Sequence, residues 1–282
     1  MAIVTLTTDL GNSDYYVAAL KGNLLQVSKP IAVVDISHLI RPFDILHASF
    51  TLNACYKDFP ENTIHIIGIN TELVVNSVNA QLPSIMLYDN HYFIANDNGI
   101  FDLILGGNKP EKFWKIDNVL SSPNGFYFPT KNIFVPTAKK IVEGEKIETF
   151  ASESETWNRA HALNTIVSEN VIKGTVIHID HYGNVITNIR KEQFMKFGDA
   201  PFTILFKKRE YHISQISTTY SDVQEGERLA LFNSIDLLEI ALNKGVANNG
   251  GSAATLLGLH LNDPIRIEFN PRGSATTIDS LF

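Results

Sequence analysis

The first 70 residues alternate between apolar strands and amphipathic helices, and this alternation constrains the fold more than any other feature. Nearly continuous apolar runs of strand length occur at 2–7, 31–37 and 63–70. Apolar residues recur at helical spacing within 17–27 and 45–59. Strands of this kind, separated by helices, predict a parallel sheet with helices on both faces.

The pattern changes after residue 80. The segment SIMLYDNHYFIA (84–95) predicts a hairpin across Asp89-Asn90, and NDNG (96–99) has the composition of a turn. A helix is predicted from about Ile133 to Val142, ending at Gly144. Residues 1–150 are therefore predicted to form an α/β domain with a mainly parallel sheet.

The second half of the chain, from about residue 151, has a different composition. Residues 151–171 carry mixed charge with little periodicity, and they are interpreted as a linker. Residues 172–282 contain short strands and turns, which predict a smaller, barrel-like all-β domain. Within it, KKRE (207–210) is interpreted as a hairpin turn and GSAATLLGL (251–259) as a helix packed on one side.

Charge and cysteine content exclude several classes of protein. The net charge is −7 without a basic stripe, which argues against nucleic acid and against an anionic membrane surface. No apolar run approaches the roughly 20 residues that span a bilayer. The single cysteine, Cys55, lies on an apolar helical stripe and is interpreted as a buried small hydrophobe. One cysteine and no signal-like N-terminus predict a cytoplasmic protein.

Carboxylates follow the first strand directly. Asp9 lies where ligands bind in open α/β sheets, and a carboxylate can accept two hydrogen bonds from a vicinal diol such as ribose. The alternative is that these side chains cap the next helix. Asp14, immediately before the helix, is interpreted as a cap, whereas Asp9 remains open between the two functions.

Two polar stretches stand out in the second half. IDHYGNVITN (179–188) places polar residues around a turn at Gly183, and the residues alone favour a structural turn. In LFNSIDLLEIALNKG (231–245), Asn233 and Ser234 precede an amphipathic stretch, so capping alone accounts for them. The scattered histidines lack metal-ligand spacing, so no metal site is predicted, and no phosphate-binding or serine-hydrolase motif occurs.

Four stretches, taken in order, resemble one family. They are TTDLGNSDYYVAALKG (7–22), VDISH (34–38), IDHYGNVITNI (179–189) and NSIDLLEIALNKG (233–245). Together they resemble the S-adenosylmethionine (SAM) hydroxide adenosyltransferases, the adenosine-forming SAM hydrolases related to fluorinase and chlorinase. The resemblance implies an α/β domain, a β-barrel domain and a homotrimer that binds SAM between the N-domain of one subunit and the C-domain of its neighbour. SAM is the substrate, and no cofactor is implied.

The resemblance also assigns roles to residues. It assigns six ligand contacts: Asp9 to the ribose hydroxyls, Phe43 to the position beside the ribose, Asp180 to the methionine ammonium, Tyr182 to the face of the adenine ring, Asn184 to the adenine edge, and Ser234 to the methionine carboxylate.

The residues expected to position the attacking water differ from the family pattern. The hydrolases use an Asp–Arg–His set, but Asn70 replaces the aspartate and Pro129 replaces the histidine. No arginine occurs between Arg41 and Arg159. Asn70 and Thr130, the latter where fluorinase has a serine hydroxyl, are therefore predicted to hold the water. Slow hydrolysis of SAM to adenosine and L-methionine, with little pH dependence, is expected.

Two alternatives accompany this prediction. A relative without the Asp–Arg–His set could bind SAM or adenosine without turnover. A calcium-dependent nucleoside hydrolase also opens with clustered aspartates, in a DTDxGxDD pattern. Here Thr7 and Tyr15 replace the first and last of them, which leaves a calcium cage short of ligands. Halogenation is disfavoured because the fluorinase tyrosine is absent at Asn70.

Overall fold

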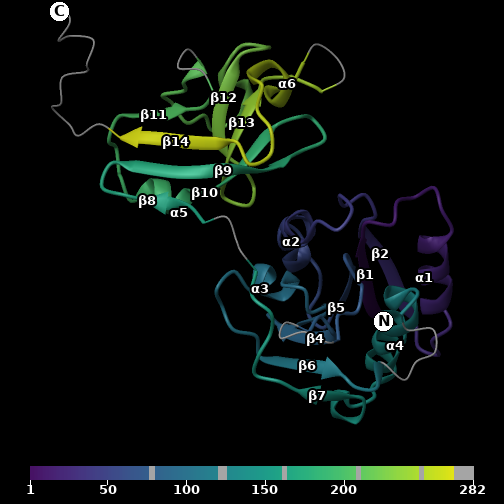
Figure 1. Ribbon diagram of the computed structural model, residues 1–282. Helices are drawn as coiled ribbons and strands as arrows, with labels where there is room; N and C mark the ends of the chain where they lie inside the picture. The colour runs from purple at the N-terminus through teal and green to yellow at the C-terminus, as the bar shows by residue number, and fades with distance from the viewer. Residues whose placement is uncertain (76–79, 120–125, 161–163, 208–210, 248–250, 270–282) are drawn as a thin grey trace, which may run out of the picture. The chain divides into compact units, whose positions relative to one another are not determined.

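The chain folds into two compact units, Met1–Ala162 and Leu163–Phe282, which are described separately (Figure 1). The computed structural model describes residues 1–75, 80–119, 126–160, 164–207, 211–247 and 251–269. Across those ranges, none of the helices has both the length and the apolar character needed to cross a membrane.

Unit 1 contains a mixed sheet with strand order β2-β1-β3-β5-β4-β6-β7. Its strands are β1 (Ala2–Thr8), β2 (Ile31–Ser37), β3 (Ile64–Gly68), β4 (Pro83–Tyr88), β5 (His91–Asn96), β6 (Lys112–Ile116) and β7 (Ala151–Glu153). The pairings β1·β2, β1·β3 and β3·β5 are parallel, whereas β4·β5, β4·β6 and β6·β7 are antiparallel.

The prediction of a mainly parallel sheet is therefore not confirmed. The predicted hairpin is present, with Asp89 and Asn90 at φ 53° and 60°, as a tight two-residue turn requires. Through this turn β4 pairs antiparallel with β5. Strand β6 then pairs antiparallel with β4, and β7 pairs antiparallel with β6 at the edge of the sheet. The parallel half remains the part that positions the ends of β1, β2 and β3.

Helices cover both faces of this sheet. Helices α1 (Tyr16–Leu24) and α4 (Val135–Glu143) enclose one buried cluster, and α2 (Ile45–Asn53) and α3 (Ile100–Leu105) enclose another (Figure 1). Asp44 caps α2 by accepting a hydrogen bond from His47 N at 2.9 Å. Gly144 ends α4 in the left-handed conformation, as expected. Cys55 is half-buried rather than fully buried.

The division between the units differs from the predicted linker at 151–171. Ala151–Glu153 forms β7, and the Trp157 ring packs 6.0 Å from that of Phe113. The Asn158 backbone N–H donates to both carboxylate oxygens of Asp97, at 2.9 and 3.2 Å. These partners lie far away in sequence, so composition could not reveal that 151–160 belongs to unit 1.

Unit 2 is a curled antiparallel sheet with the order β11-β14-β9-β10-β13-β12, and β8 pairs with β9. Its elements are β8 (Ile166–Val167), β9 (Val171–Ile179), β10 (Val185–Arg190), α5 (Lys191–Met195), β11 (Phe202–Leu205), β12 (Arg228–Phe232), β13 (Leu237–Leu242), α6 (Ala253–Leu257) and β14 (Pro264–Phe269). Single bridges join Ile213 to Ile204 and Ile216 to Ala230, so one segment links the two edge strands. The predicted smaller all-β domain is thus present as a half-barrel.

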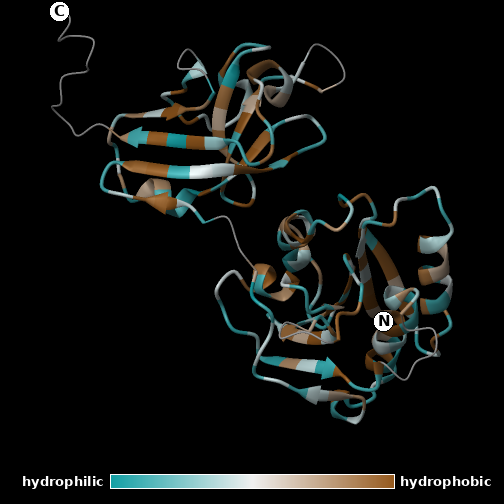
Figure 2. Ribbon diagram, in the orientation of Figure 1, coloured by the Kyte–Doolittle hydropathy of each residue, from teal (hydrophilic) through white to brown (hydrophobic). Residues whose placement is uncertain are grey.

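Residue pattern explains the strands of unit 2. Strand β14 alternates between polar and apolar residues (Figure 2), as a half-buried strand does. Strand β13 is buried along its whole length and pairs with β10 and β12. The interpretation of Ser234 as a helix cap is therefore wrong, because the stretch that follows is a central strand. The predicted turn at KKRE falls mostly on 208–210, outside the described residues.

Candidate functional site

Asp9 follows β1 at the carboxyl edge of the parallel half of the sheet. Its Oδ2 accepts a hydrogen bond from Phe43 N at 2.8 Å. Phe43 has a left-handed backbone, φ 64°, and the residue is 73% exposed. Such a conformation is costly for a bulky residue and is seen mainly where surrounding contacts impose it. The contact between Asp9 and Phe43 brings together two residues that the family resemblance assigns to the ribose of SAM.

Asp14 does not cap α1. The helix begins after Tyr15, and no side chain caps its N-terminus. Asp14 is exposed at this position. The carboxylate that makes a specific contact in this loop is therefore Asp9, which the sequence left open between capping and function.

A buried histidine braces the ends of β1 and β2. His38 Nδ1 lies 2.7 Å from Thr8 Oγ1, and Nε2 lies 3.1 Å from Asp35 Oδ1. Lys21 also contacts Asp35. Burial alone would raise the pKa of Asp35, but the hydrogen bonds from Lys21 and His38 lower it overall. The Thr8 side chain is wholly buried, so this chain of contacts supports the turn at Asp9 from inside and reaches solvent only at Asp35 and Lys21.

Asn70 lies in a turn directly after β3. Its backbone is left-handed, φ 46°, and its carbonyl accepts from Asn98 Nδ2 at 3.0 Å. The same amide donates to Ile69 O at 3.1 Å, and Asn96 Nδ2 donates to Glu72 O at 2.7 Å. Two asparagines of the NDNG segment thus hold the turn that presents Asn70. The composition of NDNG predicted only a turn, without these contacts.

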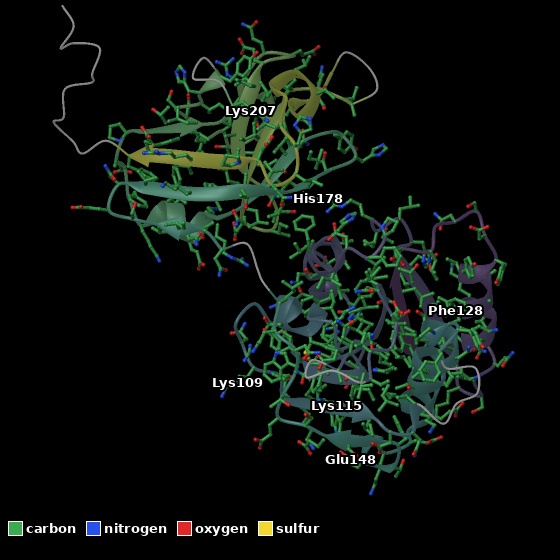
Figure 3. All side chains as sticks on the ribbon, viewed as in Figure 1. Lys109, Lys115, Phe128, Glu148, His178 and Lys207 are labelled. Atoms are coloured by element: carbon green, nitrogen blue, oxygen red, sulfur yellow. The ribbon has the colours of Figure 1, made fainter. Side chains whose placement is uncertain are left out.

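Thr130 packs against the end of β3. It begins a π-helical turn, Thr130–Phe134, that runs into α4, and it is 1% exposed. A side chain on Gly68 would place its Cβ 2.8 Å from Thr130 Oγ1 and 3.3 Å from Thr8 Cγ2. The absence of a side chain at Gly68 therefore lets Thr130 approach β3. Phe128, labelled in Figure 3, packs edge-on against Tyr16 with ring centroids 5.5 Å apart.

In unit 2, Asp180 and Asn184 belong to one tight turn between β9 and β10. Asp180 Oδ1 accepts from Asn184 N at 2.8 Å, and Oδ2 accepts from Asn184 Nδ2 at 3.1 Å. Gly183 has φ 84°, and its carbonyl accepts from Ala254 N at 3.0 Å. Tyr182 is 59% exposed. The turn is structural, as its residues suggested, and it also presents three of the predicted contacts together.

Ser234 is exposed in the turn between β12 and β13. Asn233 Oδ1 organises this turn by accepting from Ile235 N at 3.2 Å and Leu237 N at 3.1 Å. Sequence analysis missed Glu239, which is 3% exposed in β13 and accepts from Tyr220 Oη at 2.6 Å. A lone acid within the apolar strand LLEIAL was the signal available in the sequence.

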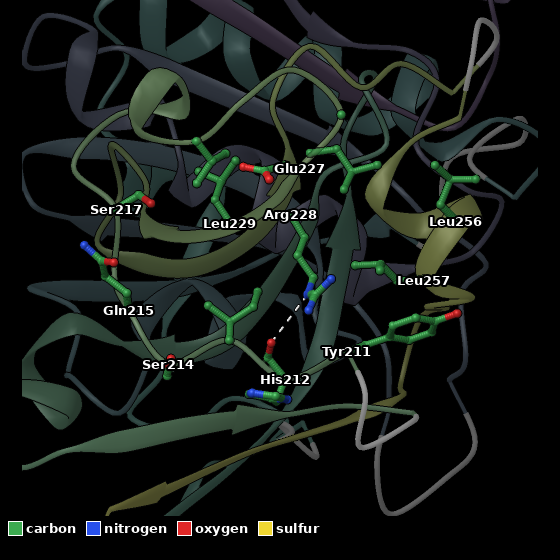
Figure 4. Close-up of a pocket in the computed structure, with 14 residues that line it drawn as sticks. Tyr211, His212, Ser214, Gln215, Ser217, Glu227, Arg228, Leu229, Leu256 and Leu257 are labelled. Carbon is green, nitrogen blue, oxygen red and sulfur yellow. Dashed lines mark hydrogen bonds between the residues drawn. The ribbon is translucent and has the colours of Figure 1, made fainter.

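Two hollows, one in each unit, lie away from these residues. A hollow of about 560 Å³ in unit 2 lies between 211–217, β12 and α6, where Arg228 Nε donates to His212 O at 3.4 Å (Figure 4). Another, of about 320 Å³, lies beside Met1 in unit 1. Neither is lined by a residue predicted to bind the ligand. The described residues contain no group of three or more His, Cys, Asp or Glu side chains that could hold a metal ion.

Comparisons with known proteins identify the family of the chain. The family model for the SAM hydroxide adenosyltransferase N-terminal domain matches residues 4–151, and the model for the C-terminal domain matches 174–266. A relative from Methanocaldococcus jannaschii named (R)-S-adenosyl-L-methionine hydrolase is 29% identical over 85% of this chain and 88% of its own. One of the same name from Thermus thermophilus is 24% identical, over 95% and 100%.

A solved structure has the same overall chain fold. The crystal structure of an uncharacterised conserved protein from Thermotoga maritima matches with a TM-score of 0.81 and 25% sequence identity. The match covers 94% of this chain and 99% of that one.

Proposed function

Because the chain belongs to the SAM hydroxide adenosyltransferase family, we propose that it hydrolyses SAM to adenosine and L-methionine. The observation that carries this proposal is the match of both family domains, in order, in one chain. Relatives named SAM hydrolase that align with 85% or more of the chain support the same reaction.

The reaction is an in-line displacement at the ribose C5′. The water oxygen forms a bond to C5′ while the C5′–S bond breaks, and the electron pair of that bond stays on sulfur. The sulfonium thereby becomes the neutral thioether of methionine, and the water releases one proton to solvent. Since the leaving group is already activated, the protein contributes chiefly by orienting the reactants and excluding bulk water. The reaction as written uses only SAM and water, with no cofactor.

The predicted ligand contacts retain free hydrogen-bonding capacity. The Asp9 carboxylate has about four lone-pair positions, and the Phe43 N–H occupies one of them. Asp180 likewise keeps lone pairs after its two bonds with Asn184, and Asn184 keeps its carbonyl oxygen and one N–H for the adenine edge. We therefore assign the ribose to Asp9 and Phe43, the adenine to Tyr182 and Asn184, and the methionine end to Asp180 and Ser234.

Asn70 and Thr130 are proposed to hold the attacking water. Asn70 is partly exposed and can both donate and accept, whereas Thr130 is buried against Gly68 at the end of β3. Neither residue is a base. Because general acid–base assistance is typically worth about 10²–10⁴-fold, its absence predicts a slow enzyme.

The family resemblance supports a homotrimer in which unit 1 of one subunit and unit 2 of its neighbour share one SAM molecule. Ligand residues in both units, each set incomplete for SAM, are consistent with that arrangement. One cysteine in 282 residues fits a reducing compartment, and we propose the cytoplasm.

The second candidate function is binding of SAM without turnover. It is favoured by Asn70, by Pro129 and by the lack of arginine between Arg41 and Arg159. Incubation with SAM in ¹⁸O-labelled water distinguishes the two. Hydrolysis predicts one ¹⁸O atom in the 5′-hydroxyl of adenosine and unlabelled methionine. Recovery of intact SAM alone would support the binder, and label in methionine would contradict attack at C5′.

A further inference from the structure

Glu239 is the unexplained acid of unit 2. It lies in the middle of β13, opposite Ile186 of β10 and Leu231 of β12, and only 3% of it is exposed. A buried ionisable side chain is unfavourable unless its contacts compensate for lost hydration. The surroundings of Glu239 should therefore show why an acid occupies this position.

Two hydrogen bonds hold the Glu239 carboxyl group. Tyr220 Oη donates to Oε1 at 2.6 Å, and Asn233 Nδ2 donates to Oε2 at 3.4 Å. The side-chain oxygen Oδ1 of Asn233 meanwhile accepts from Ile235 N and Leu237 N. Glu239 thereby holds the amino end of the Asn233 amide, and the oxygen end of the same amide holds the turn that exposes Ser234.

Among the described residues of unit 2, no basic side chain forms an ion pair with Asp180 or Glu239. Burial and the nearby Asp180 carboxylate both raise the pKa of Glu239, so the two acids repel one another. Tyr220, the other titratable group here, has its pKa raised by burial and by its bond to Glu239. In the described part of unit 2 the ion pairs are Lys191–Asp236, Lys207–Asp263, Lys244–Glu225, His260–Asp263 and Arg266–Glu268, which include neither Asp180 nor Glu239.

We propose that Glu239 is a positioning and specificity residue that makes this end of the site select a positively charged ligand group. It holds the Asn233–Asp236 turn so that Ser234 faces the ligand, and its charge adds to that of Asp180. This inference rests on the proposed function, in which the methionine end of SAM, with its ammonium and sulfonium, is bound here. Adenosine lacks that end and is the neutral reference ligand.

Glu239→Gln tests the proposal because it removes the charge while keeping the shape. Calorimetry with SAM and with adenosine should show about a ten- to hundredfold loss of SAM affinity, from the Coulomb energy of one charge at short range, and unchanged adenosine affinity. Glu268→Gln is the matched control: this carboxylate lies in β14 of the same unit and pairs with Arg266 at 2.7 Å. It should change neither affinity. An unchanged ratio of SAM to adenosine affinity in Glu239→Gln would overturn the proposal.

Tyr220→Phe gives a second reading if the buried substitution impairs folding. Tyr220 is 43% exposed, and its hydroxyl is the closer donor to Glu239. Losing that bond should weaken SAM binding about three- to tenfold and leave adenosine binding unchanged. Equal losses for both ligands would reduce Glu239 to a structural role. Wild-type protein that binds adenosine but not SAM would instead refute the proposed function, and this inference with it.

Discussion

The two units present their candidate ligand residues in chemically different ways. At the carboxyl edge of β1 and β3 in unit 1, the residues around the proposed water position are amides and hydroxyls, and Asp9 is the acid proposed to bind the ligand. In unit 2, Asp180 of the β9–β10 turn lies near a second acid, Glu239 of β13, and neither has a basic partner among the described residues. The difference suggests that binding of a cationic ligand and activation of water depend on separate sets of residues.

The two regions share one structural device, a glycine that admits a hydroxyl-bearing side chain. Gly68 admits Thr130 to the end of β3, and Gly183 admits Ser252, the N-cap of α6, to the turn of Asp180. The backbone of Gly183 is left-handed at φ 84°, whereas Gly68 has an ordinary conformation. The turn of unit 2 should therefore be the more sensitive of the two.

Gly183→Ala should have the largest effect. A Cβ there would overlap Ser252, and a left-handed alanine adds strain of about 1–2 kcal/mol. With overpacking of about 1–3 kcal/mol, the free energy of unfolding of unit 2 should fall by about 2–5 kcal/mol in urea titrations. Gly68→Ala, which lacks the backbone strain, should cost only about 1–3 kcal/mol. Equal losses would contradict the difference between the two turns.

Asp97→Asn should raise the free energy of unfolding of unit 1 at neutral pH, because Asp97 is a buried structural acid and not a proposed ligand residue. Asp97 is buried in unit 1, and burial, only partly offset by the Asn158 N–H, raises its pKa to about 6 from 3.8. Ionisation therefore costs the folded state more than the unfolded one, so stability is retained below pH 4 and lost as the pH rises toward 6. At about 1.4 kcal/mol per unit, the variant should be more stable than wild type by up to about 3 kcal/mol at pH 7.5 and similar to it below pH 4. A stability difference that does not vary with pH would refute this.

Asp9→Ala should weaken SAM and adenosine equally, because both contain the ribose. Hydrogen bonds to a charged group are worth about 1.5–3 kcal/mol, which corresponds to about a ten- to hundredfold loss of affinity. Calorimetry with both ligands checks this, and Asp14→Ala, an exposed acid of the same loop, is the control that should change nothing. Full affinity in a folded Asp9→Ala protein would remove Asp9 from the site.

Asn98→Ala should have the smallest effect of these variants. It should lower the turnover number while leaving the affinity for SAM nearly unchanged. Its amide holds the carbonyls of Ile69 and Asn70, so its loss should loosen the turn that presents Asn70. We expect about a tenfold lower kcat with KM nearly unchanged, since misplacement of a positioning group impairs the reaction more than binding. Asn108→Ala, which removes an exposed amide bonded to Tyr88, provides the matched control. A rise in KM alone would show that Asn98 supports binding instead.

Local sequence patterns predicted the elements whose determinants are close in the chain. The alternation of apolar runs predicted β1, β2 and β3 with their helices, and Asp89-Asn90 predicted the hairpin. Patterns did not predict the direction of the sheet beyond β5, because β6 and β7 pair through contacts distant in sequence. The assignment of 151–160 to unit 1 depends on Asp97 and Phe113 for the same reason.

The candidate site was predictable to a similar extent. Motif resemblance placed Asp180 and Asn184 together, and the structure shows them bonded in one turn. The roles of Asn98 and Glu239 depend on side-chain contacts with Asn70, Tyr220 and Asn233 that no local pattern contains. Conversely, Asp14 followed the pattern of a helix cap, yet α1 begins two residues later without one.

The central claim is that this chain hydrolyses SAM without a titrating catalytic residue. Its most direct test is kcat for adenosine formation at saturating SAM, measured by chromatography at intervals from pH 6 to 9. The account predicts slow but repeated turnover and a nearly flat profile, because neither Asn70 nor Thr130 titrates in this range. A steep profile would show that an ionising residue, with His38 the first to be tested, carries the reaction. Absence of adenosine above a protein-free control would contradict the enzyme assignment itself.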